Sequence, residues 1–198
     1  MKQIAIYGGS FDPIHNAHTE IIKRLSGEYD VVVVIPTTIR YYKENKQMFS
    51  FSARFNSVVE KTKTFANVKV LDIERSVSDN WRFINSLLAV KKIYGEENEY
   101  FLAMGSDSFQ KFKTWCSWEN IVKEVSSIIV FHRPGFEEKD FPSGIKFEYI
   151  KDMDMNISST YLREQLRNYL SEAEDFDMMI DDLLFCKGYE EYLEDYHY

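Results

Sequence analysis

Apolar residues along this chain fall into two patterns: short unbroken runs, and stretches in which they recur every three or four positions. Unbroken runs of this kind indicate buried strands, whereas the wider spacing indicates helices with one buried face. The runs predict strands at residues 4–7, 30–35, 100–104 and 127–131. Residues 68–73 predict a further strand, and the alternating residues 145–150 predict an edge strand. The wider spacing predicts a helix through Ile21, Ile22 and Leu25 that Gly27 ends, helices at 51–65, 81–94 and 158–170, and two short helices within 106–123.

The order of these elements predicts the fold class. Strands that alternate with helices are typical of an α/β fold, a doubly wound parallel sheet with helices on both faces and right-handed crossovers. Residues 30–35 favour this fold because strands of a parallel sheet are buried on both faces and are therefore apolar throughout. Such sheets bind ligands at the carboxyl ends of their strands. We therefore expect the segments at Gly8, Pro36, Gly105 and Arg133 to converge on one cleft.

The segment GGSFDPIHNAH, residues 8–18, lies where the first predicted strand turns into the first helix. Unpaired backbone N–H groups and the helix dipole make such a turn attractive to anions, phosphate above all. Gly8 and Gly9 leave room for a ligand beside the backbone, and His15 and His18 project from one side of the first helical turn. The pattern suits phosphoryl or nucleotidyl transfer. A structural or metal-binding role for the two histidines stays open, although zinc would need further ligands.

A second cluster, ISSTYLR at residues 157–163, opens the last predicted helix. Ser158, Ser159 and Thr160 are consecutive hydroxyls, and Arg163 lies one turn further on. A helix cap needs only one hydroxyl. Three hydroxyls with exposed N–H groups and a guanidinium that can form paired hydrogen bonds indicate a polyphosphate site.

The two segments together resemble the two signatures of the nicotinate/nicotinamide mononucleotide adenylyltransferases, a branch of the nucleotidyltransferases with an H-x-x-H motif. The resemblance implies a Rossmann-like fold in which the phosphates of ATP lie between the two segments. It implies that His15, His18 and Arg163 are catalytic and stabilise charge on the phosphates. From these segments it implies ATP contacts by Gly8, Gly9, Ser10, Phe11, His18, Ile157, Ser158, Ser159, Thr160 and Arg163.

Three shorter stretches extend the resemblance. Gly105 and Asp107 are similar to a G-x-D segment whose aspartate contacts the nucleotide ribose, and Arg133 opens an RPG that borders the adenine pocket in the family. A helix cap at Asp107 and an ordinary turn at Arg133 are the plainer alternatives. Trp115 falls where the family places an aromatic residue that stacks on the pyridine ring.

The acceptor side departs from the family pattern. Bacterial members carry PPHK after the second strand, whereas this chain reads TTIRYYKENK at residues 37–46, so that Arg40, Lys43 or Lys46 would supply the basic contact. The resemblance implies that Ser10, Lys43, Lys46 and Trp115 bind the acceptor. It implies transfer of AMP from ATP to a pyridine mononucleotide, with nicotinate mononucleotide preferred and pyrophosphate released, in NAD biosynthesis. The alternatives are another acceptor, such as phosphopantetheine, or a nucleotide-binding protein without turnover.

Composition limits the partners. The net charge is −8, but the ten acids and one base of residues 170–198 carry it, since residues 1–169 hold 22 acids and 23 bases. No basic face of the kind that binds nucleic acid is apparent. We expect small-molecule substrates and Mg²⁺, which would be held by ATP phosphates and water rather than by the protein. The sequence leaves the oligomeric state open, a homo-oligomer included.

Length and cysteine use predict the domain plan and location. We expect one nucleotidyltransferase domain at residues 1–170 and an acidic, aromatic helical tail at 171–198 that packs on it. No apolar run approaches the roughly 20 residues that span a bilayer, and no signal peptide is recognisable. Cys116 and Cys186 lie too far apart for a metal-binding motif. A cytoplasmic protein without a membrane partner is the simplest interpretation.

Overall fold

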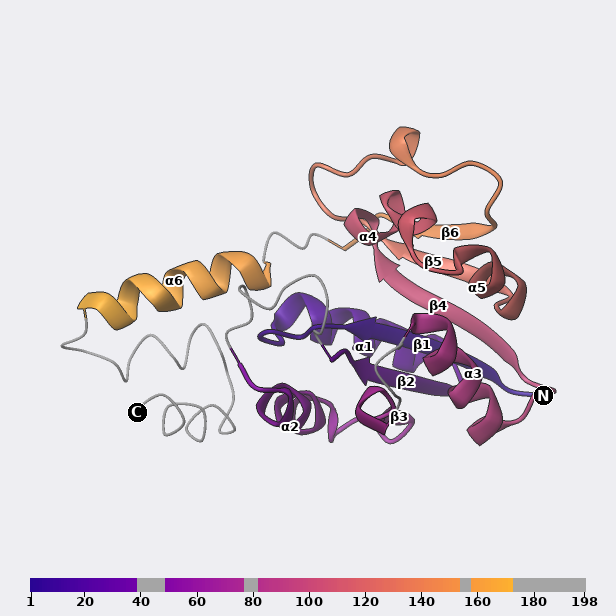
Figure 1. Cartoon of the computed structure of the whole chain (residues 1–198), viewed down its shortest axis with the longest axis horizontal. Coiled ribbons are helices and arrows are strands. Elements are labelled where there is room, and N and C mark those ends of the chain that lie inside the picture. The colour runs from indigo at the N-terminus through magenta and orange to yellow at the C-terminus, as the bar shows by residue number, and fades with distance from the viewer. Residues whose placement is uncertain (39–48, 77–81, 154–157, 173–198) are drawn as a thin grey trace.

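A computed structural model describes residues 1–38, 49–76, 82–153 and 158–172, the last six of these by their backbone only (Figure 1). Six parallel strands form one sheet in the order β3-β2-β1-β4-β5-β6. The strands are β1 (Gln3–Gly9), β2 (Val31–Pro36), β3 (Val68–Val70), β4 (Glu99–Gly105), β5 (Ser127–Phe131) and β6 (Phe147–Ile150). The predicted parallel, doubly wound sheet is confirmed, with β6 at its edge as expected.

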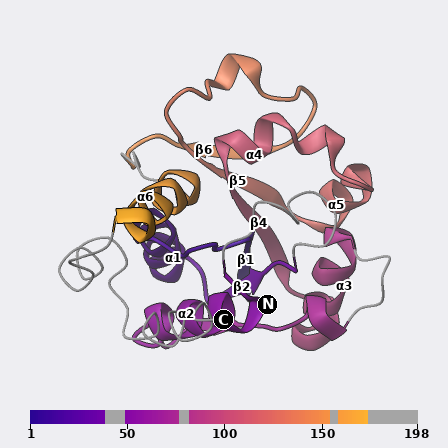
Figure 2. The same cartoon turned by 60° about the vertical axis from the view of Figure 1, so that its left-hand side comes forward.

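Helices cover both faces of the sheet (Figures 1 and 2). They are α1 (Asn16–Glu28), α2 (Phe51–Thr62), α3 (Phe83–Tyr94), α4 (Ser106–Gln110), α5 (Trp118–Glu124) and α6 (Ser159–Glu172), with short 3-10 turns at Glu74–Ser76, Phe112–Thr114 and Glu138–Asp140. Buried residues of α3, α4 and α5 form a core on one face, and those of α1 and α2 form a core on the other. No helix in the described ranges is long and apolar enough to cross a membrane.

The pleat of the central strands explains their unbroken apolar runs. Successive side chains of a strand point to opposite faces. Ile4 and Ile6 of β1 accordingly belong to the core under α3, whereas Ala5 and Tyr7 belong to the core under α1. Because both faces are covered, no position along the middle of such a strand can be polar.

Several element boundaries differ from those predicted, most of them by one or two residues. Helix α1 runs through Gly27 to Glu28, and the N–H of Tyr29 still donates to the carbonyl of Leu25, because a single glycine weakens a helix without ending it. Helix α2 ends at Thr62 rather than at residue 65. Strand β3 stops at Val70, after which Leu71 N–H still bonds to β2 before the chain turns. Position 81, the predicted start of α3, lies outside the described residues.

The carboxyl ends of the strands meet at one edge, as the sequence predicts. Register places Gly9 beside Pro36 and Gly105 beside Phe131. The N-terminus of α6 reaches the same edge, and both views place this helix beside α1 (Figures 1 and 2). Its Ser159 hydroxyl donates to the carbonyl of Pro13 at 3.0 Å. The two motifs, far apart in sequence, are therefore adjacent in space.

Candidate active site

The two histidines of the first motif stack at the start of α1. Their ring centroids lie 3.7 Å apart with an interplanar angle of 20°, and both side chains are buried. His18 Nδ1 accepts a hydrogen bond from the backbone N–H of His15 at 3.3 Å, which leaves Nε2 as the protonated nitrogen of a neutral His18 ring. Neither ring nitrogen of His15 has a hydrogen-bond partner among the described residues. A buried polar group without a partner costs free energy that a bound ligand would recover.

Burial keeps both imidazoles neutral. Burial, with a smaller contribution from the positive charge of Arg133, lowers the pKa of His15 to about 3. Burial also lowers the pKa of His18 well below its ordinary value, with smaller contributions from His15 and Arg133. A phosphate placed beside the rings would oppose these effects because a nearby negative charge favours the protonated form. The site thus presents neutral N–H donors that can gain charge when a phosphate binds.

Phe11 shapes the turn between β1 and α1. Its φ of 45° lies in the left-handed region, which is costly for a residue with a side chain. Its buried ring meets His18 edge-on at 5.0 Å between centroids. A Cβ at Gly9 would lie 3.0 Å from this ring, and one at Gly8 would lie 3.1 Å from Phe83. The two glycines therefore leave room for close packing of aromatic rings, a reason that differs from the expected approach of a ligand.

Each hydroxyl of the second motif has a different partner. Ser158 Oγ accepts from the N–H of Tyr161 at 3.2 Å, which is an ordinary helix cap. Ser159 joins the first motif through Pro13, and Thr160 Oγ1 accepts from Arg163 Nη2 at 3.1 Å. One hydroxyl therefore caps α6, and the other two hold the first motif and the guanidinium in place.

Arg163 joins the two motifs directly. Its Nη1 donates to the carbonyl oxygen of Asp12 at 2.6 Å and lies 3.7 Å from Asp12 Oδ2. Asp12 Oδ1 in turn accepts from the N–H of Phe49, just before α2, at 3.0 Å. Both the guanidinium and the carboxylate are buried. This network fixes the entry of α1, the entry of α2 and the first turn of α6 relative to one another.

A second charged pair lies at the ends of β4 and β5. Arg133 Nε is 3.5 Å from Asp107 Oδ1, and the backbone N–H of Arg133 donates to Ser106 Oγ at 2.8 Å. A Cβ at Gly105 would lie 2.5 Å from Asp107 Oδ1 and 3.2 Å from Arg133 Nε, so only glycine leaves room for the pair. Asp107 lies in the first turn of α4, and its side chain does not cap that helix. The structure thus brings together Gly105, Asp107 and Arg133, the three residues predicted for ribose and adenine.

Trp115 lies on the α3 side of the sheet and is partly buried. Its ring meets Phe83 at 5.5 Å between centroids in an edge-on arrangement and Phe112 at 5.4 Å. Because Phe83 also packs against Gly8, an aromatic contact joins Trp115 to the first motif. Trp118 is partly buried and packs against the core on the same face of the sheet. Three predicted site residues, Lys43, Lys46 and Ile157, lie outside the described residues.

Sequence reasoning missed the buried charges around this edge. Asp12 was part of the first motif, but no role was expected for it, and Arg54 and Glu74 were not singled out. Arg54 is only 1% exposed because it lies one turn before Val58, on the inward face of α2. A charged residue on the apolar face of a predicted helix was the available signal, because such residues are rarely buried without partners. Glu74 follows a short strand and carried no comparable signal.

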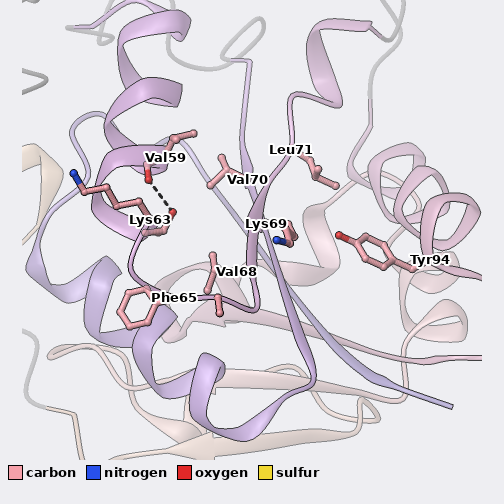
Figure 3. A pocket seen from close by; sticks show the side chains of 10 residues that line it. Val59, Lys63, Phe65, Val68, Lys69, Val70, Leu71 and Tyr94 are labelled. Atoms are coloured by element: carbon pink, nitrogen blue, oxygen red, sulfur yellow. Dashed lines mark hydrogen bonds between the residues drawn. The ribbon is translucent and has the colours of Figure 1, made fainter.

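A surface hollow of about 500 Å³ lies elsewhere, along the edge strand β3 (Figure 3). Val68 and Val70 come from the strand itself, Lys63 from the end of α2 and Tyr94 from the end of α3. Apart from Lys63 and Lys69, its lining residues are uncharged, and none belongs to either motif. The hollow is separate from the candidate active site.

The donor set of the site fits phosphates better than a protein-bound metal. Among the described residues, no three or more histidine, cysteine, aspartate or glutamate side chains are placed to hold a metal ion. The carboxylate of Asp12 already contacts Phe49 and Arg163. A metal that arrives on the phosphates of a nucleotide, with water as its other ligand, is compatible with this arrangement.

Comparison with known proteins identifies the family. A model of the cytidylyltransferase-like family matches residues 6–165. The chain therefore belongs to the cytidylyltransferase-like family. The fold agrees, because the structure of a Plasmodium falciparum nicotinic acid mononucleotide adenylyltransferase complexed with NaAD superposes with a TM-score of 0.74 at 23% identity, covering 98% of this chain and 96% of that one.

Curated relatives indicate to which branch of the family the chain is most similar. A protein of Fusobacterium nucleatum is 31% identical over 172 residues, 84% of this chain and 88% of its own length. One of Leptospira interrogans is 31% identical over 170 residues, 80% of this chain and 82% of its own length. Both are named probable nicotinate-nucleotide adenylyltransferase. The resemblance to the nicotinate/nicotinamide mononucleotide adenylyltransferases is thereby confirmed.

Proposed function

We propose that this chain is an enzyme that transfers the adenylyl group of ATP to a pyridine mononucleotide, with nicotinate mononucleotide preferred, and releases pyrophosphate. The product would be a dinucleotide of NAD biosynthesis. The observation that carries the proposal is buried His15, whose ring nitrogens have no hydrogen-bond partner among the described residues, stacked on His18 at a helix N-terminus that Arg163 also reaches. The names of the curated relatives support the same acceptor.

In the proposed mechanism, the phosphates of ATP lie between residues 8–18 and residues 158–163. An oxygen of the acceptor phosphate attacks the α-phosphorus, the bond from that phosphorus to the bridging oxygen breaks, and pyrophosphate leaves. His15 and His18 donate N–H groups to the phosphates, and Arg163 adds a fixed positive charge. Because the donors are held by packing before the substrate arrives, they need little reorganisation as charge develops.

The remaining predicted site residues would bind either the nucleoside part of ATP or the acceptor. Asp107 would bind the ribose, while Gly105 and Arg133 would border the adenine. Ser10, Trp115, Lys43 and Lys46 would bind the acceptor, with Trp115 against the pyridine ring. Ser10 would contact both substrates because it lies in the turn between β1 and α1, at the edge of the sheet where both substrates are proposed to bind.

ATP enters this proposal as its magnesium complex. Mg²⁺ would neutralise phosphate charge and polarise the reacting phosphorus, and its ligands would be phosphate oxygens and water. The protein's part is to hold the phosphates with the histidines, Arg163 and the N–H groups of two helix starts. We propose no nucleic-acid or membrane partner. We also propose a cytoplasmic location, which rests on the two widely separated cysteines.

A pyrophosphate-release assay tests this function. Purified protein with ATP and Mg²⁺ is given nicotinate mononucleotide, nicotinamide mononucleotide or phosphopantetheine in parallel. We expect turnover with both pyridine nucleotides, faster with the nicotinate form, and none with phosphopantetheine. Turnover with phosphopantetheine alone would overturn the acceptor assignment but keep adenylyl transfer. Absence of turnover with every acceptor, in protein that still binds ATP, would favour a nucleotide-binding protein.

A further inference from the structure

A buried guanidinium joins the ends of two strands beside the candidate site. Arg54 Nη1 donates to the carbonyl of Ser10, in the first motif, and to the carbonyl of Thr37, after β2, at 3.0 Å for the second contact. The N–H of Thr37 donates to the carbonyl of Gly9 at 2.8 Å. One side chain of α2 therefore sets how the chain leaves β2 relative to the turn that bears Ser10.

A buried carboxyl group holds the next residue. Glu74 Oε2 accepts from the backbone N–H of Thr38 at 2.6 Å and from the Thr38 hydroxyl at 3.1 Å. Glu74 is 1% exposed, and its Oε1 has no hydrogen-bond partner among the described residues. Of the charged groups around it, Arg54 acts on it from α2, while Asp72 and Arg75 of its own segment pair with each other at 2.7 Å.

We propose that Arg54 and Glu74 are positioning residues that fix the end of β2 and so set the acceptor side of the cleft. The inference rests on the proposed function. It concerns the acceptor because the predicted acceptor contacts Lys43 and Lys46 follow Thr38 in the sequence, and because Ser10 is predicted to touch the acceptor as well as ATP. The predicted ribose and adenine contacts instead lie at the end of β4, on α4 and after β5, and the other predicted phosphate contacts lie on residues 8–18 and at the start of α6.

Energetics favour positioning over simple stabilisation. Burying a charged pair costs desolvation energy, and apolar residues of similar size often stabilise a fold as well or better. Both side chains direct their hydrogen bonds to the backbone of one exit segment, Thr37–Thr38 and the turn beside it. Charged hydrogen bonds to backbone groups restrict geometry more tightly than apolar packing does. The arrangement suits a segment whose exact placement matters.

The ionisation of Glu74 gives the inference a second readout. Burial raises the pKa of Glu74 to about 7, although the two Thr38 hydrogen bonds and Arg54 each lower it. The carboxylate accepts stronger hydrogen bonds than the neutral acid. Thr38 should therefore be held more firmly at pH 8 than at pH 6.

Steady-state kinetics with Glu74→Gln and Thr38→Val test the pair, with Asp72→Asn as the matched control. Asp72→Asn removes the same charge two residues away, from a carboxylate that pairs with Arg75 instead. We expect Glu74→Gln to raise the KM for the acceptor about tenfold and Thr38→Val to raise it less, with the KM for ATP changed by no more than about twofold. The control should leave both constants unchanged. Equal effects on the two substrates, or none in either test variant, would overturn the inference.

The pH profile separates positioning from general damage. The ratio of wild-type to Glu74→Gln kcat/KM for the acceptor should be largest at pH 8 and approach one by pH 6. Titration of the acceptor's own phosphate cancels in this ratio. A ratio that does not change with pH would contradict the role of the carboxylate. If wild-type protein forms no dinucleotide, the proposed function itself fails. If wild-type protein turns over and the variants match it, only this inference fails.

Discussion

The two sides of the proposed site use buried charge differently. On the phosphate side, Arg163 holds the first motif, yet His15 beside it keeps both ring nitrogens without a partner in the described residues. On the acceptor side, Arg54 and Glu74 are directed to backbone groups of the exit from β2. On the phosphate side, polar groups of the side chains stay available to a ligand. On the acceptor side, the buried charged groups bond to the protein's own chain.

This difference explains which residues a motif can reveal. Groups that bind phosphate must come from helix starts and adjacent side chains, and therefore lie close together in sequence. Groups that position a loop can come from any element that packs behind it. Arg54 and Glu74 lie 20 residues apart and on different elements, α2 and the turn after β3. Variants on each side should accordingly differ in which kinetic constant they change.

The largest effect is expected on the phosphate side, in turnover. His18→Ala should lower kcat roughly a hundredfold, about 3 kcal/mol, because it removes a preorganised donor to charge that develops in the transition state. The KM for ATP should change much less. Initial rates over a range of ATP concentrations measure both constants.

His18→Asn is the matched variant for this test. Its amide oxygen can still accept from the N–H of His15, so the start of α1 keeps its hydrogen bond while Nε2 is lost. It should be as slow as His18→Ala with a melting temperature nearer wild type. Near-wild-type turnover in a folded His18→Ala protein would remove the histidine from the mechanism.

An intermediate effect is expected in ATP binding. Arg163→Lys keeps the charge but loses the planar fork, so the single ammonium cannot hold Asp12, Thr160 and a phosphate together. We expect the KM for ATP to rise about tenfold and the KM for the acceptor to stay near wild type. Arg24→Lys, an exposed arginine of α1, is the control. An unchanged KM for ATP would confine Arg163 to joining the two motifs.

The smallest effect is expected on the acceptor side. Trp115→Ala should raise the KM for nicotinate mononucleotide about fivefold, because ring stacking contributes about 1 kcal/mol beyond buried area. Trp115→Phe keeps a flat ring and should recover most of the loss. Trp118→Ala, from a partly buried tryptophan with no predicted site role, serves as the control for packing. If Trp115→Ala left the KM for the acceptor unchanged, stacking would be ruled out.

Much of the fold could be predicted because the pattern of apolar residues within each strand indicates which faces of that strand are buried. Residues 31–35 and 128–131 are apolar on both faces, and the strands predicted at 30–35 and 127–131 form β2 and β5 nearly as expected. The ends were harder to predict, since they depend on neighbours. Gly27 did not end α1, and β3 proved short although its apolar run continues to Ile73.

The candidate site divides in the same way. The convergence of the strand ends at Gly8 and Gly105 follows from a parallel sheet, which the sequence predicts, whereas the convergence of residues 8–18 with residues 158–163 was implied by the family resemblance. The partners of Arg163 do not follow, because a hydrogen bond to the carbonyl of Asp12, 151 residues away, depends on how α6 docks. The glycines were predicted to lie in the site, but the packing of Phe11 and Phe83 against them could be seen only in the structure.

Burial of Glu74 also couples proton binding to folding, in the direction opposite to the histidines. The pKa of His15 falls from 6.5 to about 3 on folding, so its contribution to the free energy of unfolding is present above pH 6.5 and is lost as the pH falls toward 3. The pKa of Glu74 rises from 4.5 to about 7, so its contribution is present below pH 4.5 and is lost as the pH rises through 7. Between pH 4.5 and 6.5 each changes the stability by about 1.4 kcal/mol per pH unit, with opposite signs. The carboxyl group of Glu74 thus offsets part of the acid sensitivity that the two buried histidines bring to the fold.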